Sequence, residues 1–261
     1  MKALILAAGY ATRLYPLTKE FPKPLLAVQG RPIIDYIIDK LEAIGEIDEI
    51  IVVTNSKFIS HFRKWADQLQ SSKRISLVDD LTKTLGSRRG AVGDMYFAVA
   101  RKRIKDDLLV IGGDNLFGGN LDDFISFAEE NKPYPAIGVY DIKDKSEAKK
   151  YGVVKLDREK KLVDFREKPA DPDSTLVAMC LYYFPKENLS LIKEYARIHL
   201  GENDATGFYI DWLRRKVPVY GAIFSAAGMT SETINFITRQ RKGLSINKGG
   251  LNVIAKTFFY F

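Results

Sequence analysis

Two residue types that often carry chemistry in proteins are scarce in this sequence. Cys180 is the single cysteine, so the chain cannot form an internal disulfide. His61 and His199 are too few for a zinc site built from cysteine and histidine. This cysteine usage fits the cytoplasm best. The chemistry is therefore expected to rest on charged side chains and on the backbone.

Long apolar runs are also missing. No segment approaches the roughly eighteen uncharged apolar residues that a membrane-spanning helix needs, so we expect no membrane partner. The apolar run at the N-terminus, within MKALILAAG, is too short for the core of a signal peptide and leads into a glycine-containing loop. We interpret it as a first β-strand.

The chain is basic, with 40 Lys and Arg residues against 33 Asp and Glu and a net charge of +7. The basic residues are dispersed rather than gathered into runs, and no recognition motif is present, so we expect no nucleic-acid partner. A basic surface attracts phosphorylated small molecules equally well. The fingerprint GxGxxG is absent, which disfavours an NAD-dependent enzyme, and no GxxxxGK[ST] follows the first strand.

Short apolar runs alternate with helical stretches through the first half of the chain. This alternation predicts an α/β fold with a Rossmann-like, doubly wound, mostly parallel sheet. The strands are predicted at 3–7, 50–53, 74–78, 108–111 and 136–140. The helices between them are predicted at 33–44, 57–69, 93–102 and 121–130.

Beyond residue 140 the pattern changes to short strands separated by polar turns, which predicts a small antiparallel element covering the sheet. Its strands are predicted at 153–156, 162–166 and 176–183. The remaining elements are helices at 189–199, 207–214 and 230–239 and a strand at 219–224. We expect one domain over 1–242 and an off-pattern tail, 243–261, whose apolar end suggests a contact in a homo-oligomer.

The segment after the first strand has the composition of a phosphate-binding loop. Ala7, Ala8 and Gly9 have little side-chain bulk, so backbone N–H groups can approach an anion closely. Arg13 offers a forked contact to phosphate oxygens, and Lys23, held between two prolines, offers a fixed point charge. Taken singly, each of these features is more typical of an ordinary turn or a solvated loop.

Several motifs resemble the sugar-phosphate nucleotidyltransferases, typified by glucose-1-phosphate thymidylyltransferase. They are AAG, TRL, PLT and PKPLL after the first strand, GDN at 113–115, then YGVVKLD and LVDFREKP. The resemblance implies transfer of a nucleotidyl group from a nucleoside triphosphate to a sugar 1-phosphate, with Mg²⁺ as cofactor and pyrophosphate as second product. It favours dTTP or UTP, and glucose 1-phosphate, as substrates.

The resemblance also implies a role for individual residues. Arg13 and Lys23 are the catalytic residues, and Asp114 binds the metal, although GDN alone is more typical of an ordinary turn. The nucleotide is expected against Leu6, Ala7, Ala8, Gly9 and Gly90. The sugar phosphate is expected against Gly152, Glu167 and Lys168, which without the resemblance indicate only a hairpin with charged outer residues. Arg88 or Arg89 is expected near the base.

The sequence departs from the family pattern at several positions. Ala11 replaces a second glycine of the phosphate loop, which weakens triphosphate binding if an unusual dihedral angle is needed. Asp94 and Met95 stand where small and amide residues are usual near the base, with Asp94 otherwise expected to cap or solvate its helix.

Two further points concern the metal and the cysteine. The usual Trp-x-Asp-x-Gly, which supplies a second metal ligand, is replaced by FSAAGMTSET, leaving Glu232 or Asp211 as substitutes. Cys180 is interpreted as a buried small hydrophobe rather than a nucleophile. These departures keep a second hypothesis open, a nucleotide-binding or sugar-nucleotide-binding relative with impaired catalysis.

Overall fold

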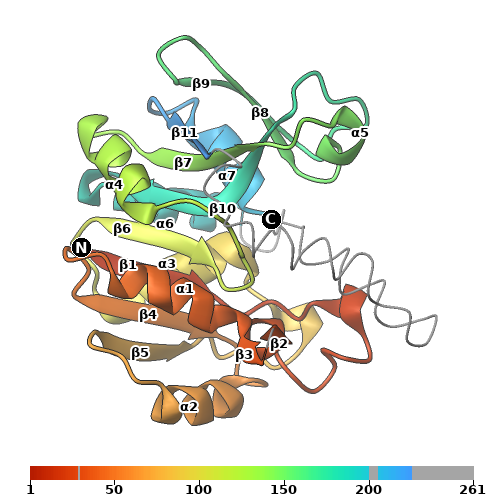
Figure 1. The fold of residues 1–261 in the computed structure, drawn as a ribbon, viewed down its shortest axis with the longest axis vertical. Coiled ribbons are helices and arrows are strands. Elements are labelled where there is room, and N and C mark those ends of the chain that lie inside the picture. Colours follow the sequence, from red (N-terminus) through yellow and green to blue (C-terminus); the bar gives the residue numbers. More distant parts are fainter. Residues whose placement is uncertain (29, 200–204, 225–261) are drawn as a thin grey trace.

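The computed structural model describes residues 1–28, 30–199 and 205–224 (Figure 1). A large sheet runs through the middle, with its main strands in the order β11-β7-β10-β6-β1-β4-β5. β1 is parallel to β4 and β6, and β10 is antiparallel to its neighbours β6 and β7. These strands are β1 (Lys2–Leu6), β4 (Glu49–Thr54), β5 (Arg74–Asp79), β6 (Leu108–Gly112), β7 (Ala136–Asp141), β10 (Leu176–Phe184) and β11 (Tyr220–Phe224).

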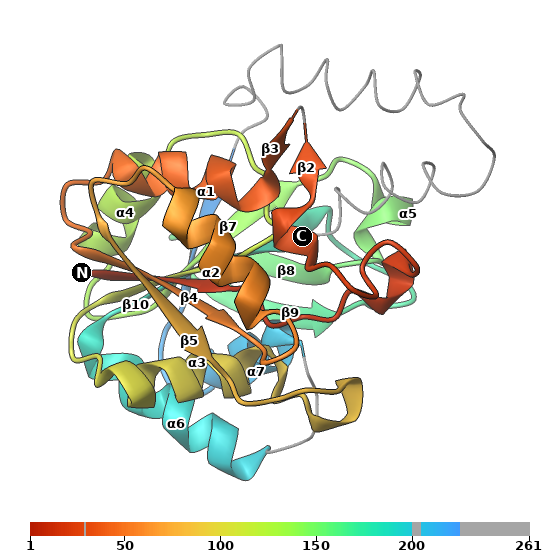
Figure 2. The ribbon, with the colours of Figure 1, turned by 90° about the horizontal axis from the view of Figure 1, so that it is seen from below.

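Helices cover both faces of this sheet, which confirms the doubly wound prediction (Figure 2). On one face lie α1 (Ile33–Glu42), α2 (Ile59–Gln68) and α4 (Leu121–Glu130). On the other lie α3 (Gly90–Lys102), α6 (Leu189–Ile198) and α7 (Thr206–Leu213). Because successive side chains of a strand point to opposite faces, Ala3 and Ile5 of β1 enter one core and Leu4 enters the other.

The antiparallel element is a hairpin of β8 (Gly152–Leu156) and β9 (Leu162–Glu167). It does not cover the sheet as predicted but joins it at the side, because Val153 pairs with Val177 of β10. A short helix that the sequence pattern did not predict, α5 (Lys145–Ala148), precedes the hairpin. Its N-cap is Asp144, whose carboxylate accepts a hydrogen bond from the Ser146 N–H.

Several smaller features lie between these elements. Residues 12–14 and 23–25 form single turns of 3₁₀-helix in the segment after β1, and β2 (Ala27–Val28) pairs with β3 (Arg31–Pro32) just before α1. The predicted helix 230–239 and the tail 243–261 lie outside the described residues.

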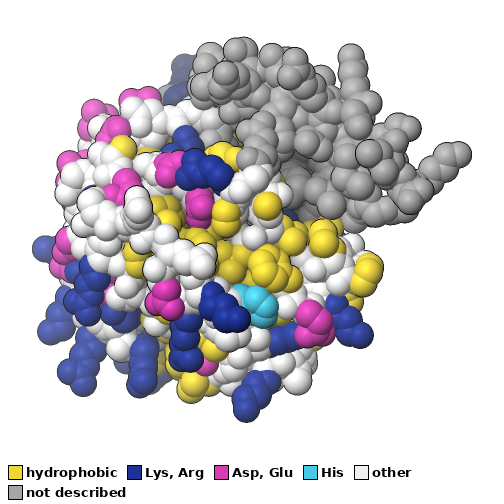
Figure 3. Space-filling model, turned by 60° about the horizontal axis from the view of Figure 1, so that its bottom comes forward, with side chains coloured by type: hydrophobic (Ala, Val, Ile, Leu, Met, Phe, Trp, Pro, Cys, Tyr) yellow, Lys and Arg dark blue, Asp and Glu magenta, His cyan; other side chains and the backbone are white. Residues whose placement is uncertain are grey.

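The distribution of charged side chains on the surface agrees with the dispersed charge predicted from the sequence. On the face shown in Figure 3, Lys and Arg side chains stand along the margin with Asp and Glu among them, and hydrophobic side chains occupy the middle. Within residues 1–28, 30–199 and 205–224, no helix is long and apolar enough to cross a membrane.

Candidate functional site

A cleft of about 640 Å³ opens at the carboxyl ends of β1 and β6. In open α/β sheets this edge is where ligands bind. Its walls come from the segment after β1, the start of α3, the hairpin, β10 and the start of α7. Eight of the residues predicted for the site line it: Leu6, Ala8, Gly9, Gly90, Asp114, Gly152, Glu167 and Lys168.

The wall after β1 is held from behind by the end of β4. Asn55 Nδ2 donates to the Ala8 carbonyl at 2.8 Å, and Thr54 Oγ1 donates to the Ala7 carbonyl at 3.2 Å. Both donors are fully buried. Ala7 itself is buried behind the wall, whereas Gly9 is exposed and a methyl group added to it would meet nothing within 4 Å. These bonds orient a backbone of small residues toward the cleft.

Ala11, the residue that replaces the usual glycine, has a left-handed backbone with φ 46° and ψ 44°. Its carbonyl accepts hydrogen bonds from Thr18 Oγ1 at 2.8 Å and from the Leu14 N–H at 2.9 Å. In this conformation the Cβ of an L-residue crowds the following carbonyl oxygen, at a cost of roughly 1–2 kcal/mol. The unusual dihedral angle considered from the sequence is therefore present at the rim of the cleft.

Lys23 and Asp114 form an ion pair at the bottom of this wall, with Nζ 2.5 Å from Oδ2. The Lys23 side chain is 8% exposed and does not line the cleft, while that of Asp114 is 38% exposed and does. The ammonium group thus sits directly behind the carboxylate. Next to Asp114, the Asn115 amide donates to the Cys180 carbonyl of β10 at 3.2 Å, which fixes the GDN turn against the sheet.

Arg13 lies apart from these groups. It is exposed on the 3₁₀ turn after Ala11 and is not a lining residue of the cleft. The sequence indicated a cation in this segment but could not indicate which way its side chain points.

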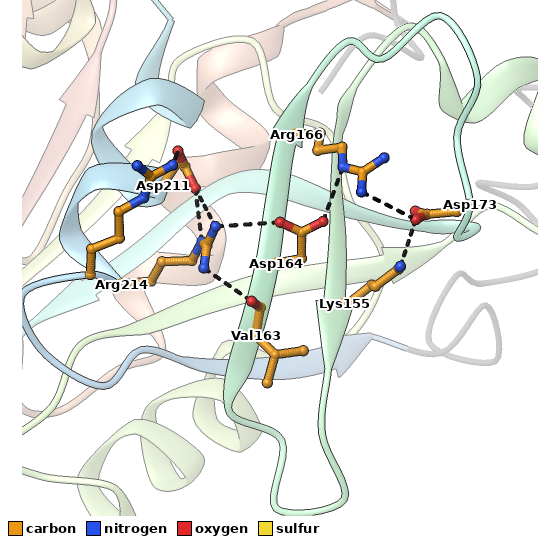
Figure 4. Close-up of polar contacts among 8 residues, drawn as sticks. Lys155, Val163, Asp164, Arg166, Asp173, Asp211 and Arg214 are labelled. Carbon is orange, nitrogen blue, oxygen red and sulfur yellow. Dashed lines mark hydrogen bonds and ion pairs between the residues drawn. The ribbon is translucent and has the colours of Figure 1, made fainter.

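Asp114 is the carboxylate that a metal would use. Among the described residues there is no group of three or more His, Cys, Asp or Glu side chains that could hold a metal ion. Asp211 already pairs with Arg214 at 2.7 Å (Figure 4). It also pairs with Arg215. Glu232 lies outside the described residues. Mg²⁺ is usually bound by one or two carboxylates together with phosphate oxygens, so Asp114 fits it as a single protein ligand.

The opposite wall is built around Glu167, the last residue of β9. Gly152 pairs directly with Glu167 across the hairpin, and Gly207 of α7 lies against the same carboxylate. A methyl group at Gly207 would collide with Glu167 Oε2 and would lie 2.7 Å from the Phe165 ring. The two glycines therefore leave the space in which the carboxylate and the ring sit.

Lys168 turns the chain away from the hairpin beside Glu167. Its φ is 45°, its N–H donates to the Tyr151 carbonyl at 2.9 Å, and its Nζ lies 3.0 Å from Glu167 Oε1. The ammonium group is half exposed and so remains available to an anion in the cleft.

The sequence pattern missed Gly207 and the pair beside it, Tyr182 and Thr206, whose hydroxyls are 2.6 Å apart. All three line the cleft. The sequence pattern predicted only that a helix starts at residue 207, and no motif at that position indicated a binding site.

The far end of the cleft is the start of α3, which begins at Gly90 rather than at the predicted Gly93. Gly90 has φ 75°, Arg88 lines the cleft and Arg89 does not. The expectation that Asp94 caps or solvates the helix is wrong, because Asp94 lies in the second turn and is 7% exposed.

Cys180 also lines the cleft, from β10. Burial, together with the nearby Asp114 charge, raises the pKa of its thiol to about 12. The thiolate that a nucleophile needs is therefore scarce at neutral pH. The sequence predicted a buried residue, whereas Cys180 is only partly buried.

The fold and the site define a Rossmann-like α/β protein whose ligand cleft lies at the carboxyl ends of parallel strands. The chain belongs to the nucleotidyl transferase family, whose sequence profile matches residues 2–225.

Two relatives and one structure illustrate this similarity. The bifunctional protein GlmU of Methanocaldococcus jannaschii is 30% identical over 79% of this chain and 45% of its own length. A candidate mannose-1-phosphate guanyltransferase of Sulfolobus acidocaldarius is 32% identical over 74% of this chain and 50% of its own. The chain thus spans about half the length of these relatives. The crystal structure of a candidate glucose-1-phosphate thymidylyltransferase from Bacillus anthracis matches in fold, with a TM-score of 0.72, 22% identity and coverage of 97% and 99% of the two chains.

Proposed function

We propose that the protein transfers a nucleotidyl group from a nucleoside triphosphate to a sugar 1-phosphate, releasing pyrophosphate. The observation that carries this proposal is that one cleft holds both a small-residue wall and a carboxylate–ammonium wall. Gly9 and Asp114 lie on one side, and Glu167 and Lys168 lie on the other. Two phosphorylated substrates can thus meet between them.

On the nucleotide side, the backbone around Ala8 and Gly9 approaches the triphosphate, and Lys23 supplies positive charge from behind Asp114. Arg13 extends that charge at the rim when its exposed side chain turns inward. Bound at Asp114, Mg²⁺ would neutralise charge on the phosphate oxygens.

On the sugar side, Glu167 accepts hydrogen bonds from sugar hydroxyls, and Lys168 holds the sugar phosphate. An oxygen of that phosphate attacks the α-phosphorus of the nucleotide, and the bond from the α-phosphorus to the leaving pyrophosphate breaks. No general base is needed, because a phosphate monoester is already ionised near neutral pH. Catalysis then depends mainly on positioning and charge neutralisation.

The motifs favour dTTP or UTP, with glucose 1-phosphate, as substrates. The relatives do not select among bases, since their names include a guanyl- and a thymidylyltransferase. We treat residues 1–242 as the domain that carries the activity and the tail as a possible subunit contact.

A second candidate is a binding protein with impaired catalysis. Two observations favour it: the left-handed Ala11 at the phosphate wall, and the absence, among the described residues, of a group of three or more His, Cys, Asp or Glu side chains around Asp114 that could hold a metal. The two candidates share the fold and differ in turnover.

The test is pyrophosphate release with Mg²⁺ across a grid of five nucleoside triphosphates and several sugar 1-phosphates. Lys23→Ala should lower kcat/KM by about 10²–10³, the usual loss for one charge-stabilising group. Lys19→Ala, an exposed lysine of the same segment, should leave it unchanged. Silence in every combination, with nucleotide binding intact, would instead establish the impaired relative.

A further inference from the structure

Side chains from a neighbouring strand hold the wall of small residues after β1. Asn55 Nδ2 donates to the Ala8 carbonyl, and Thr54, the last residue of β4, donates to the carbonyl before it. In the sheet, β1 lies between β4 and β6. The cleft is lined on the β6 side, by Gly112, and by none of the residues of β4. Both carbonyls are therefore held toward β4, away from the side on which the cleft opens.

The direction of these carbonyls decides where the next two N–H groups point. In a trans peptide unit the C=O and the N–H that follows it point in opposite directions. Because the Ala8 carbonyl is held toward β4, the Gly9 N–H is turned toward the cleft, and the Ala7 carbonyl has the same effect on the Ala8 N–H. Within the described chain, neither N–H donates to a backbone carbonyl. Successive backbone N–H groups of this kind can bind an anion.

Asn55 is itself fixed on every side. It is 0% exposed, and its Oδ1 accepts a hydrogen bond from the Phe58 N–H at 3.0 Å. Its backbone carbonyl accepts from the N–H groups of Phe58 and Ile59 at 3.1 and 3.0 Å. The Phe58 ring lies 6.1 Å from the ring of Tyr10, which lines the cleft. One buried amide thus connects the wall after β1 to the start of α2.

We propose that Asn55 is a positioning residue for the nucleotide, which directs the Gly9 N–H to the triphosphate by holding the Ala8 carbonyl. This inference rests on the proposed function, because it takes the wall after β1 as the triphosphate side of the cleft. Asn55 does not line the cleft and so acts through the backbone. Donors that are aligned before the substrate binds need no reorganisation when charge develops on the phosphates.

The experiment measures equilibrium binding of inorganic tripolyphosphate, with Mg²⁺, to the full chain. This probe has no base, so the result does not depend on which nucleotide the protein uses. Asn55→Asp keeps the shape of the side chain and an acceptor for the Phe58 N–H, but a carboxylate cannot donate to the Ala8 carbonyl. Kd for tripolyphosphate should rise about tenfold or more, the usual range for a hydrogen bond to a charged group.

Two further variants separate positioning from stability. Thr54→Val has almost the same shape and loses only the 3.2 Å bond to the Ala7 carbonyl, so Kd should rise by a smaller factor, about threefold to tenfold. Asn188→Asp places a carboxylate at another buried asparagine, 8% exposed, and should leave Kd unchanged. Asn188 lies beyond the end of β10, where Phe184 pairs with the start of β6, at the edge of the sheet opposite the cleft.

Initial rates provide a second readout that a purely structural asparagine would not change selectively. In Asn55→Asp, KM for the nucleotide should rise, whereas KM for the sugar 1-phosphate should stay nearly unchanged because Lys168 lies on the opposite wall. In the wild type, tripolyphosphate should shift the backbone amide NMR signals of Ala8 and Gly9. Asn55→Ser, which adds no buried charge, replaces Asn55→Asp if that variant does not fold.

An unchanged Kd for tripolyphosphate in a folded Asn55 variant would overturn the proposal. Equal losses in Asn55→Asp and Asn188→Asp, or unshifted amide signals of Ala8 and Gly9 in the wild type, would overturn it as well. Binding of tripolyphosphate that depends on Asn55, without pyrophosphate release from any nucleotide, would contradict the proposed function and leave this inference standing. Turnover that is insensitive to Asn55 would do the reverse.

Discussion

The half of the cleft proposed for the nucleotide (the nucleotide half) has a backbone wall of small residues after β1 and β6, whereas the half proposed for the sugar (the sugar half) has side chains of β9 and α7 in its wall. The first wall is fixed by buried hydrogen bonds from Thr54 and Asn55. The second depends on the space that Gly152 and Gly207 leave for Glu167. One half therefore depends on backbone conformation and the other on packing.

The sugar half is also connected to the rest of the protein by side-chain ion pairs. Arg214, the residue that follows α7, reaches the Asp164 carboxylate of β9 at 3.3 Å and the Val163 carbonyl at 3.0 Å (Figure 4). Arg166 then bridges Asp164 and Asp173. These largely surface ion pairs add little stability each, so the hairpin relies on its packing against α7. Substitutions that change side-chain volume are therefore expected to damage the sugar half. Substitutions that change the preferred backbone dihedral angles are expected to affect the nucleotide half.

Gly207→Ala is expected to have the largest effect. The added methyl group collides with Glu167 and presses on the Phe165 ring, and overpacking of this kind costs typically about 1–3 kcal/mol. KM for the sugar 1-phosphate should rise more than KM for the nucleotide, as measured by initial rates. Gly45→Ala, where the methyl group would meet nothing within 4 Å, is the matched control. Equal rises in both KM values would contradict packing as the basis of the sugar half.

Ala11→Gly tests the nucleotide half and is expected to have a smaller effect of opposite sign. Glycine removes the strain of the left-handed alanine but loses more chain entropy on folding. The difference should raise the free energy of unfolding by about 0.5–1 kcal/mol. Denaturant unfolding measures this. Gly30→Ala, at φ 81° with nothing within 4 Å of the added methyl group, should destabilise the protein instead. A destabilised Ala11→Gly would show that the backbone at this position is not strained.

Asp80→Asn is expected to have the smallest effect, and only at higher pH. Because burial raises the pKa of Asp80 in the folded state, the folded protein holds a proton that the unfolded chain releases. That contribution is complete below the ordinary pKa of about 3.9 and is lost as the pH rises through the raised value. The variant should therefore melt above the wild type at neutral pH, and the difference should shrink as the pH falls. A difference that does not change with pH would refute the raised pKa.

Much of the nucleotide half could be predicted from the sequence because its signals are local. The apolar run of β1, the small residues after it and GDN after β6 each lie in one short stretch. Which side chains line the cleft was beyond such reasoning, since neither Arg13 nor Lys23 does so, and Lys23 instead pairs with Asp114. Gly207 escaped notice because its role is to contact Glu167, 40 positions earlier in the chain.

The sequence by itself determined the order of strands and helices and the small-residue loop, because periodicity and residue size act over a few neighbouring positions. It also determined that an alanine stands where a glycine is usual. Only the tertiary structure decided that Ala11 is left-handed, that Asp80 and Asp94 are buried, and that two glycines from different elements enclose one carboxylate. These features depend on contacts between residues far apart in the sequence, which form only when the sheet and helices pack. A pattern over a few neighbouring residues does not predict such contacts.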